Sequence, residues 1–340
     1  MSPYFLLSKG IQFITNFRKS SVITAFLLLL NFILLFEFVL SLYEVQHSYS
    51  YDISKTNLPD FNFVAAGDWG CTPNSKETVH AIINKNPELV LGLGDYSYRN
   101  SADCWLQLIE PINNKMKIVI GNHEHLDYSG KNNYYSSPER LRQYMNYFNL
   151  TQQYYSFDYQ NVHFIAMSTE IPYERGSKQF EFVKSDLEKT VANSSINWIV
   201  VFYHRIAYTS PSYLPSNPAL RETYHPLFEK NGVDLIMQGH SHNYQRSYPI
   251  KFNKENPLKP LIMDKNMTNY HKSDSQIYTI VGTGGATDEH KFPSPGSTYT
   301  AVQFNAFGFL NVNVLYNGTL LEGIFYDNSG KIRDHFIIVS

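Results

Sequence analysis

The sequence predicts a mixed α/β domain over residues 61–340, with sheets inside and helices outside. Two observations lead to this prediction. Short, nearly continuous runs of aliphatic and β-branched residues alternate with helix-like segments, and the end of the chain changes to an alternation of period two. The chain has 340 residues, 43% hydrophobic and 17% charged, which is ample material for one large domain or two small ones.

Seven apolar runs are typical of strands that are buried on both faces of a sheet. These runs lie at residues 61–68, 88–95, 117–123, 162–169, 197–204, 234–240 and 276–285. Helices are expected between the runs, and several begin with a capping signal such as Asn217-Pro218. The expected helices lie at residues 75–86, 101–114, 137–149, 177–192 and 217–231.

The tail at residues 307–339 has a different pattern. Apolar and polar residues alternate there, and turn signals occur at Asn317-Gly318 and at Asn328-Ser329-Gly330. This combination predicts an antiparallel meander. Two loops rich in Pro, Ser and Lys, around 208–218 and 249–275, interrupt the regular pattern.

The N-terminal segment is predicted to lie outside this domain. The run VITAFLLLLNFILLF at residues 22–36, continued by FVLSLY, has about the 20 residues that a helix needs to cross a bilayer. We therefore expect a transmembrane anchor at residues 21–43, followed by a polar linker at 44–60. A cleaved signal peptide, which would lead to secretion, and a buried core helix stay open as alternatives.

Positive charge predicts how the anchor is oriented. Lys9, Arg18 and Lys19 flank its N-terminal side, so residues 1–20 are expected in the cytoplasm and the domain outside it. Sequons compatible with glycosylation of exposed loops occur at Asn149, Asn193, Asn266 and Asn317. The two cysteines, Cys71 and Cys104, are expected either to form a disulfide in an oxidising compartment or to be buried free thiols.

Five of the apolar runs end in residues that can bind a metal ion. These residues are Asp68, Asp95, Asn122 with His123, His204, and His240 with His242. In a wound α/β sheet the carboxyl ends of the strands face one crevice, so we expect these side chains to converge. Each one alone is also explained as a turn former, a helix cap or a surface histidine. Their recurrence at five strand ends favours a metal site.

The types of these side chains restrict the ions. Carboxylate, imidazole and amide groups without thiolate disfavour structural zinc and suit Fe, Mn, Zn or Co. Seven such groups are too many for one ion. Two ions about 3.5–4 Å apart, bridged by a shared carboxylate, would use them well and would activate a phosphoryl group for hydrolysis.

The order G-D-x-G, G-D-x-x-Y, G-N-H-E, V-x-x-H and G-H-x-H resembles the calcineurin-like metallophosphoesterase superfamily, and within it the purple acid phosphatases. The similarity covers essentially residues 61–340. Tyr98, three residues after Asp95, is the marker of the purple branch, and GTGGA at 282–286 and the terminal meander also resemble that branch. The resemblance implies a four-layer α/β/β/α fold, in which helices flank a central β-sandwich of two mixed sheets.

The resemblance also implies the ligands of two metal ions. A ferric ion would be bound by Asp68, Asp95, Tyr98 and His242. A divalent Fe, Zn or Mn ion would be bound by Asp95, Asn122, His204 and His240, with Asp95 bridging the two ions. A metal-bound hydroxide would attack the phosphorus in line.

The resemblance further implies substrate contacts. His123, beside Asn122, would bind the phosphate and help to stabilise or protonate the leaving group. The family usually has a further substrate-facing histidine about nine residues after the histidine that corresponds to His204, and this position is Tyr213 here. His125 could take the place of this histidine in the substrate pocket, and otherwise Glu124 and His125 are expected either to support the site or to be exposed. His225 is expected to belong to a scaffold helix.

The leading hypothesis is a membrane-tethered, extracytoplasmic phosphatase that acts on phosphomonoesters of small molecules or proteins. A phosphodiesterase or nucleotidase of the same superfamily is the first alternative. A cell-surface protein without activity on this fold is the second. A net charge of −2 gives no electrostatic reason to expect nucleic acid as a partner.

Overall fold

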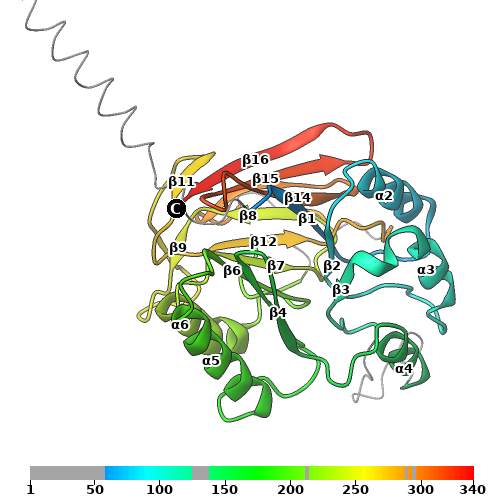
Figure 1. Ribbon diagram of the computed structural model, residues 1–340, viewed down its shortest axis with the longest axis horizontal. Coiled ribbons are helices and arrows are strands. Elements are labelled where there is room, and N and C mark those ends of the chain that lie inside the picture. Colours follow the sequence, from blue (N-terminus) through cyan, green and yellow to red (C-terminus); the bar gives the residue numbers. More distant parts are fainter. Residues whose placement is uncertain (1–57, 125–137, 211–213, 288–289, 293–295) are drawn as a thin grey trace, which may run out of the picture. The chain divides into compact units, whose positions relative to one another are not determined.

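The structure is a computed structural model that describes residues 58–124, 138–210, 214–287, 290–292 and 296–340. Within these residues two seven-stranded mixed sheets lie face to face, and helices cover their outer faces (Figure 1). The prediction of two mixed sheets flanked by helices is confirmed. No helix in the described part of the chain is long and apolar enough to span a membrane, and the span predicted at 21–43 lies outside the described residues.

The first sheet joins a parallel half to an antiparallel half. The parallel strands are β1 (Phe61–Ala66), β2 (Leu89–Gly92) and β3 (Met116–Ile118). The antiparallel strands are β14 (Gly308–Leu315), β15 (Leu320–Asp327) and β16 (Ile332–Val339), and β11 (Asn269–His271) lies parallel to β16 at the edge. The strand order is β11-β16-β15-β14-β1-β2-β3. The predicted C-terminal meander is therefore confirmed.

The second sheet is also mixed. Its parallel core consists of β5 (Val162–Ala166), β6 (Trp198–Tyr203), β7 (Leu235–Gln238) and β12 (Ile277–Val281). Antiparallel strands flank this core: β4 (Tyr155–Tyr159), β8 (Tyr244–Ser247) and β13 (Thr300–Phe304). The strand order is β13-β8-β12-β7-β6-β5-β4, and β9 (Ile250–Lys251) pairs separately with β10 (Leu261–Ile262).

Alternate residues of the strands make the core between the sheets. Phe63 of β1 meets Phe164 of β5 edge-on, with 5.1 Å between the ring centroids, and both side chains are fully buried. The opposite faces of the same strands pack against helices, as Val64 and Val90 do. The central strands are thus apolar on both faces, which explains the continuous apolar runs in the sequence.

Helices cover each sheet on its outer side. The first sheet is covered by α2 (Pro73–Ile83), α3 (Asp103–Leu108), the 3₁₀ helix η1 (Glu110–Lys115) and α4 (Pro138–Tyr147). The second sheet is covered by α5 (Lys178–Val191) and α6 (Pro218–Lys230). The Ser177 hydroxyl and the Asn217 amide oxygen each accept a hydrogen bond from a first-turn backbone N–H, and so cap α5 and α6.

The structure differs from the predicted elements in two respects. The helix expected at 101–114 is divided into α3 and η1, because Pro111 at the start of η1 cannot donate the hydrogen bond that would continue α3. The other difference is in the strands. The short strands β9, β10 and β11 lie within the loop expected around 249–275, and β4, β8 and β13 were not predicted either. The sequences of β4, β8 and β13, YSFDY, YQRS and TAVQF, contain polar residues that make them look like loops.

A buried ion pair connects the two sheets. Arg246 on β8 donates from Nε and Nη2 to the two carboxylate oxygens of Asp334 on β16, at 2.6 and 2.9 Å. Arg246 Nη1 also donates to the Tyr270 hydroxyl of β11, and the Tyr244 hydroxyl donates to Asp334. The side chains of Arg246 and Asp334 are 0% and 4% exposed, so these bonds satisfy charges that water cannot reach.

We expect Asp334→Ala to destabilise the fold by about 3–5 kcal/mol, because it leaves the Arg246 guanidinium charged and buried without its partner. The control is Arg142→Ala, which removes an ion pair with Glu139 on the exposed surface of α4 and should cost less than about 1 kcal/mol. Urea unfolding of both variants measures the difference. Similar losses in the free energy of unfolding for the two variants would contradict a stabilising role of the buried Arg246–Asp334 pair.

The imidazole of His163 on β5 lies between two carboxylates. Its Nδ1 is 2.5 Å from Asp158 Oδ1 at the β4–β5 hairpin, and its Nε2 is 2.9 Å from Asp186 Oδ2 on α5. Both nitrogens can donate only when the ring is protonated. Burial lowers the pKa of His163, but the hydrogen bonds to Asp186 and Asp158 outweigh burial and raise this pKa above its usual value.

We expect His163→Gln to destabilise the protein more at acidic than at alkaline pH. Because the native pKa of His163 is raised, its contribution is complete below the unfolded-state pKa of about 6.5 and is lost as the pH rises through the native pKa. Urea unfolding of the wild type and the variant over a range of pH measures this. An equal loss of stability at every pH would rule out the charged form of His163.

Candidate metal centre

The ends of five strands bring the predicted ligands together. Asp68 follows β1, Asp95 follows β2, Asn122 follows β3, His204 follows β6, and His240 and His242 follow β7. These strands run parallel within each sheet, so their carboxyl ends lie at one edge of that sheet. Each of these side chains contacts at least one of the others.

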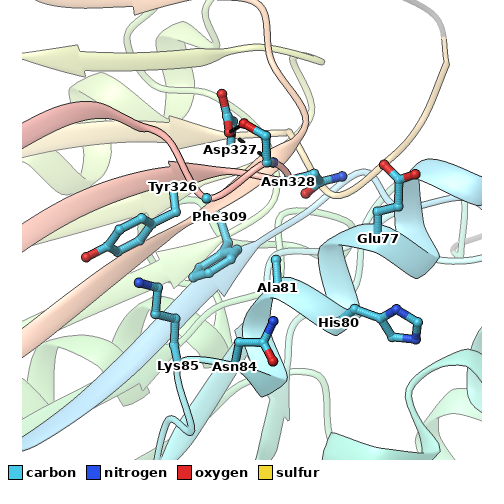
Figure 2. A pocket seen from close by; sticks show the side chains of 11 residues that line it. Glu77, His80, Ala81, Asn84, Lys85, Phe309, Tyr326, Asp327 and Asn328 are labelled. Atoms are coloured by element: carbon cyan, nitrogen blue, oxygen red, sulfur yellow. Dashed lines mark hydrogen bonds between the residues drawn. The ribbon is translucent and has the colours of Figure 1, made fainter.

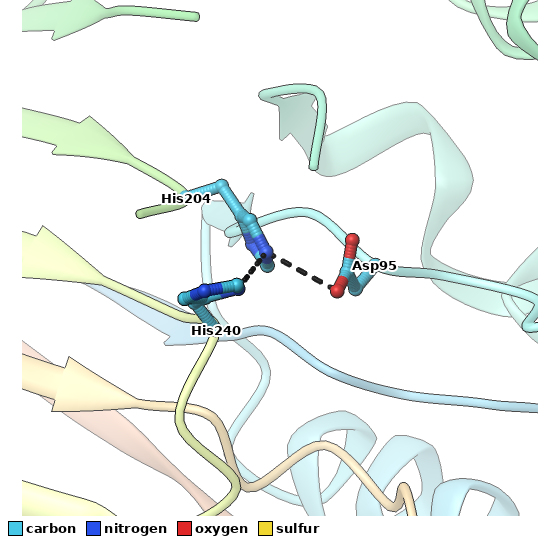
Figure 3. Close-up of side chains that lie close together, drawn as sticks. All are labelled: Asp95, His204 and His240. Carbon is cyan, nitrogen blue, oxygen red and sulfur yellow. Dashed lines mark hydrogen bonds and ion pairs between the residues drawn. The ribbon is translucent and has the colours of Figure 1, made fainter. Parts of the chain in front are cut away.

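A first group of ligands surrounds the His204 ring. Its Nε2 lies 3.1 Å from Asn122 Oδ1, 3.1 Å from His240 Nδ1 and 3.2 Å from Asp95 Oδ2. Figure 3 shows Asp95, His204 and His240 pointing toward a common centre, and one ligand atom from each lies within 4.8 Å of the others. The Nδ1 of His204 is 2.8 Å from the Leu93 carbonyl oxygen. In the neutral ring the proton is therefore on Nδ1, and Nε2 keeps its lone pair for an ion.

A second group surrounds the Tyr98 hydroxyl. This oxygen lies 2.9 Å from His242 Nε2, 3.2 Å from Asp68 Oδ1 and 3.4 Å from Asp95 Oδ2. His242 Nε2 is 3.4 Å from the same Asp68 oxygen. A phenol oxygen, an imidazole nitrogen and two carboxylate oxygens thus meet at a second point.

Asp95 belongs to both groups. Its Oδ2 contacts His204 Nε2 of the first group and the Tyr98 hydroxyl of the second, at 3.2 and 3.4 Å. Its other oxygen, Oδ1, accepts a hydrogen bond of 2.8 Å from the His123 backbone N–H. The carboxylate is fully buried and held in place, which suits a ligand shared by two ions.

The backbone is strained at these positions. Asp68, Asp95, Tyr98 and His240 have φ angles of 57°, 55°, 50° and 69°, in the left-handed region that non-glycine residues rarely adopt. Such strain persists only where the surrounding structure enforces it, and it concentrates at functional sites. A Cβ on Gly121 would lie 2.2 Å from Asp95 Oδ1, so only glycine leaves room for the carboxylate there.

Glu124 supports the site from behind. Its carboxyl group accepts hydrogen bonds from the backbone N–H groups of Asp95, Tyr96 and Gly121, at 2.7, 2.8 and 3.1 Å. It therefore fixes the loop that carries Asp95 against the loop that carries Asn122. Glu124 is fully buried, and burial together with repulsion from Asp95 raises its pKa to about 7. The alternative that Glu124 is exposed is wrong.

The candidate ligands change one another's pKa values. Burial lowers the pKa of His204, but attraction from the Asp95 carboxylate outweighs burial and raises this pKa to about 10. Burial raises the pKa of Asp95, but His204 and His123 outweigh it and hold this pKa well below its usual value. Burial and the nearby Asp68 raise the pKa of Tyr98. If cations bind to these side chains, protons would have to leave His204 and Tyr98, and binding would then depend on pH.

The chemistry of the donors fits the two ions that the sequence predicts. One group offers two imidazole nitrogens, an amide oxygen and a carboxylate. The other offers a phenol, an imidazole and two carboxylates, one of them shared. Hard oxygen and borderline nitrogen donors of this kind suit Fe, Zn or Mn.

The remaining predicted residues have different positions. The side chain of His123 is 28% exposed, and its ring lies 4.3 Å from that of Tyr98, next to both groups. Tyr213 and His125 lie outside the described residues. His225 is buried in α6 and hydrogen-bonded to Tyr208 and Gln276, which confirms a scaffold role.

The two cysteines are bonded to each other. Cys71 and Cys104 form a disulfide, so the alternative of two free thiols is wrong. The bond connects the segment after Asp68 to α3. His290 also lies against the site, with its ring stacked on that of His242 at 4.2 Å between centroids, and no motif in the sequence pointed to it.

A surface pocket of about 390 Å³ lies elsewhere, between α2 and the β15–β16 turn (Figure 2). Its lining includes Glu77, His80 and Lys85. None of the predicted ligands lines it, so this pocket is separate from the candidate metal centre.

Comparison with known proteins places the fold and the motifs in a family. A model of the calcineurin-like phosphoesterases matches residues 61–244, a range that contains all the predicted ligands. Purple acid phosphatase 15 of Arabidopsis thaliana is 24% identical over 296 residues, which cover 75% of this chain and 52% of the relative. Probable inactive purple acid phosphatase 1 of the same plant is 24% identical over 275 residues, which cover 75% of this chain and 43% of the relative.

Solved structures agree with these relatives. The purple acid phosphatase PPD1 from yellow lupin (Lupinus luteus) seeds superposes with a TM-score of 0.70 at 25% identity, over 83% of this chain and 54% of that chain. GAP50 of Plasmodium shares the fold with a TM-score of 0.55 at 17% identity, over 81% of this chain and 87% of that chain.

The chain spans about half the length of the curated relatives it matches. Residues 61–244 of this chain, which the family model matches, contain the strand ends and the loops from which the candidate centre is built. The chain therefore belongs to the calcineurin-like phosphoesterase family, and its relatives are purple acid phosphatases.

Proposed function

We propose that this protein is a binuclear metallophosphatase that hydrolyses phosphomonoesters outside the cytoplasm. The observation that carries the proposal is the position of Asp95, whose Oδ2 contacts both His204 and Tyr98. Two groups of ligands joined by one carboxylate are what two neighbouring ions require. The phosphatase names of the relatives support the same reaction class.

The two groups would hold different ions. Asp68, Tyr98 and His242, with Asp95, would hold a ferric ion, because a phenolate favours the ferric state. Asn122, His204 and His240, with Asp95, would hold a divalent Fe, Zn or Mn ion. When bound, such a pair polarises a phosphoryl oxygen and makes water a nucleophile near neutral pH.

The chain's own residues would bind and orient the ester. His123 is the partly exposed imidazole beside the two groups, and its backbone N–H fixes Asp95 Oδ1. We assign its ring to the phosphate and to the leaving-group oxygen, to which an imidazole can donate a proton. Asn122, which contacts His204, would contribute an amide to the phosphate. A substrate contact by Tyr213 stays a prediction, since this residue lies outside the described part of the chain.

A protein without activity on this fold is the second candidate, because several relatives are named probable inactive purple acid phosphatases. In this chain, however, the predicted ligand positions are filled by side chains that can bind metal, and they lie in contact. This arrangement favours activity.

We expect Asp95→Asn to lose the bound metal and to reduce phosphomonoester hydrolysis by more than about 100-fold. Losing a residue that only supports a metal ligand already costs up to about 100-fold, and Asp95 would itself be a ligand. An amide cannot supply the negative charge that two ions share. The measurement is metal content together with hydrolysis of a phosphomonoester and a phosphodiester.

The matched control is Asp103→Asn, an exposed aspartate at the start of α3, which should behave like the wild type. Near-normal turnover by Asp95→Asn would contradict the proposed site. Faster hydrolysis of the diester than of the monoester by the wild type would favour the phosphodiesterase alternative.

We also propose that residues 21–43 anchor the protein in a membrane with the domain outside the cytoplasm. The Cys71–Cys104 disulfide supports this, since such bonds persist in oxidising compartments. All four sequon asparagines are exposed or lie in exposed turns, where glycans can be accommodated.

We expect the full-length protein to stay with the membrane fraction after carbonate extraction, because about 20 apolar residues insert stably into a bilayer. A variant that lacks residues 1–43 should be released. Complete release of the full-length chain would contradict an anchor and would favour secretion after cleavage.

A further inference from the structure

His290 reaches the ligand loop from a distant part of the sequence. It lies between β12 and β13, 48 residues after His242, and its Nδ1 accepts a hydrogen bond of 3.0 Å from the His242 backbone N–H. The two rings are nearly parallel, with an angle of 10° and 4.2 Å between their centroids. His290 therefore contacts both the backbone and the ring of one predicted ligand.

Asn243 fixes the backbone of His290 against the same loop. Its side-chain N–H donates to the His290 carbonyl oxygen at 3.0 Å and to Ser241 Oγ at 3.0 Å, and the residue is fully buried. The Asn243 carbonyl in turn accepts a hydrogen bond from the backbone of Gly282. The contact between His290 and His242 is thus part of a connected network and not a chance approach of two surface rings.

The backbone N–H of each candidate ligand in this loop, His240 and His242, donates a hydrogen bond to a side chain. The backbone N–H of His240 donates to Asp68 Oδ2 at 2.7 Å, as that of His242 donates to His290. His240 has a left-handed backbone, so the loop needs such bonds to keep its shape. The stacked ring also opposes rotation of the His242 imidazole, which must keep Nε2 directed toward Tyr98 and Asp68.

We propose that His290 is a positioning residue for His242 and that it selectively strengthens the binding of the ion held by Tyr98, His242 and Asp68. The proposal rests on the proposed function, since it takes these three residues as ligands. Groups behind a ligand that fix its orientation commonly change metal affinity by about 10–100-fold. The structure makes His290 such a group through one hydrogen bond and one stacked ring.

The test compares metal release from metal-loaded full-length protein in the presence of a chelator, with each ion counted by elemental analysis. We expect His290→Leu to release one of two ions about 10–100-fold faster than the wild type and to shift any visible absorption band. The other ion should leave at the wild-type rate. His290→Asn places an amide oxygen near the position of Nδ1, so it can accept the same N–H and should recover much of the affinity.

The control is His271→Leu, an exposed histidine on β11 in the other sheet, which should match the wild type. Release of both ions at wild-type rates by His290→Leu would overturn the proposal. Equal acceleration for both ions with a lower melting temperature would also overturn it, because that indicates a general loss of structure. Wild-type protein that binds two ions but hydrolyses no phosphomonoester would refute the proposed function alone, and the release rates would still decide the role of His290.

Discussion

The shared contact of the Asp95 carboxylate is the interaction on which the rest of the candidate centre depends. One oxygen of this group contacts both His204 and Tyr98, and the other is fixed by the His123 backbone. The residue can occupy this position only because Gly121 has no side chain and because Glu124 accepts the Asp95 backbone N–H. The strained backbone of Asp95 indicates that the surrounding loops enforce this geometry.

The sandwich supplies the geometry within which this contact forms. Candidate ligands from the first sheet (Asp68, Asp95 and Asn122) meet candidate ligands from the second (His204, His240 and His242), so the candidate centre lies where the two sheets meet. The geometry of the candidate centre therefore depends on how the two sheets are positioned relative to each other. The buried contact between Arg246 and Asp334 holds the sheets together through residues of β8 and β16 that belong to no ligand group.

Six of the candidate ligands could be selected from the sequence because each follows an apolar run, and parallel strands direct their carboxyl ends to one edge. Tyr98 could be selected only through the resemblance to the purple acid phosphatases. The strand β8 could not be predicted, since Arg246 looks like a surface residue until Asp334, 88 residues later, is placed beside it. Glu124 was visible as part of the GNHE motif, but its role depends on backbone groups of another loop. His290 carried no local signal at all, because its contact with His242 exists only in the folded chain.

We propose that one chain holds two metal ions bridged by the Asp95 carboxylate. Elemental analysis of the purified full-length protein, combined with its absorption spectrum, would decide this. We expect two ions per chain, and a visible band where one of them is ferric and bound by Tyr98. A single ion per chain, or none in protein that is shown to be folded, would refute a binuclear centre.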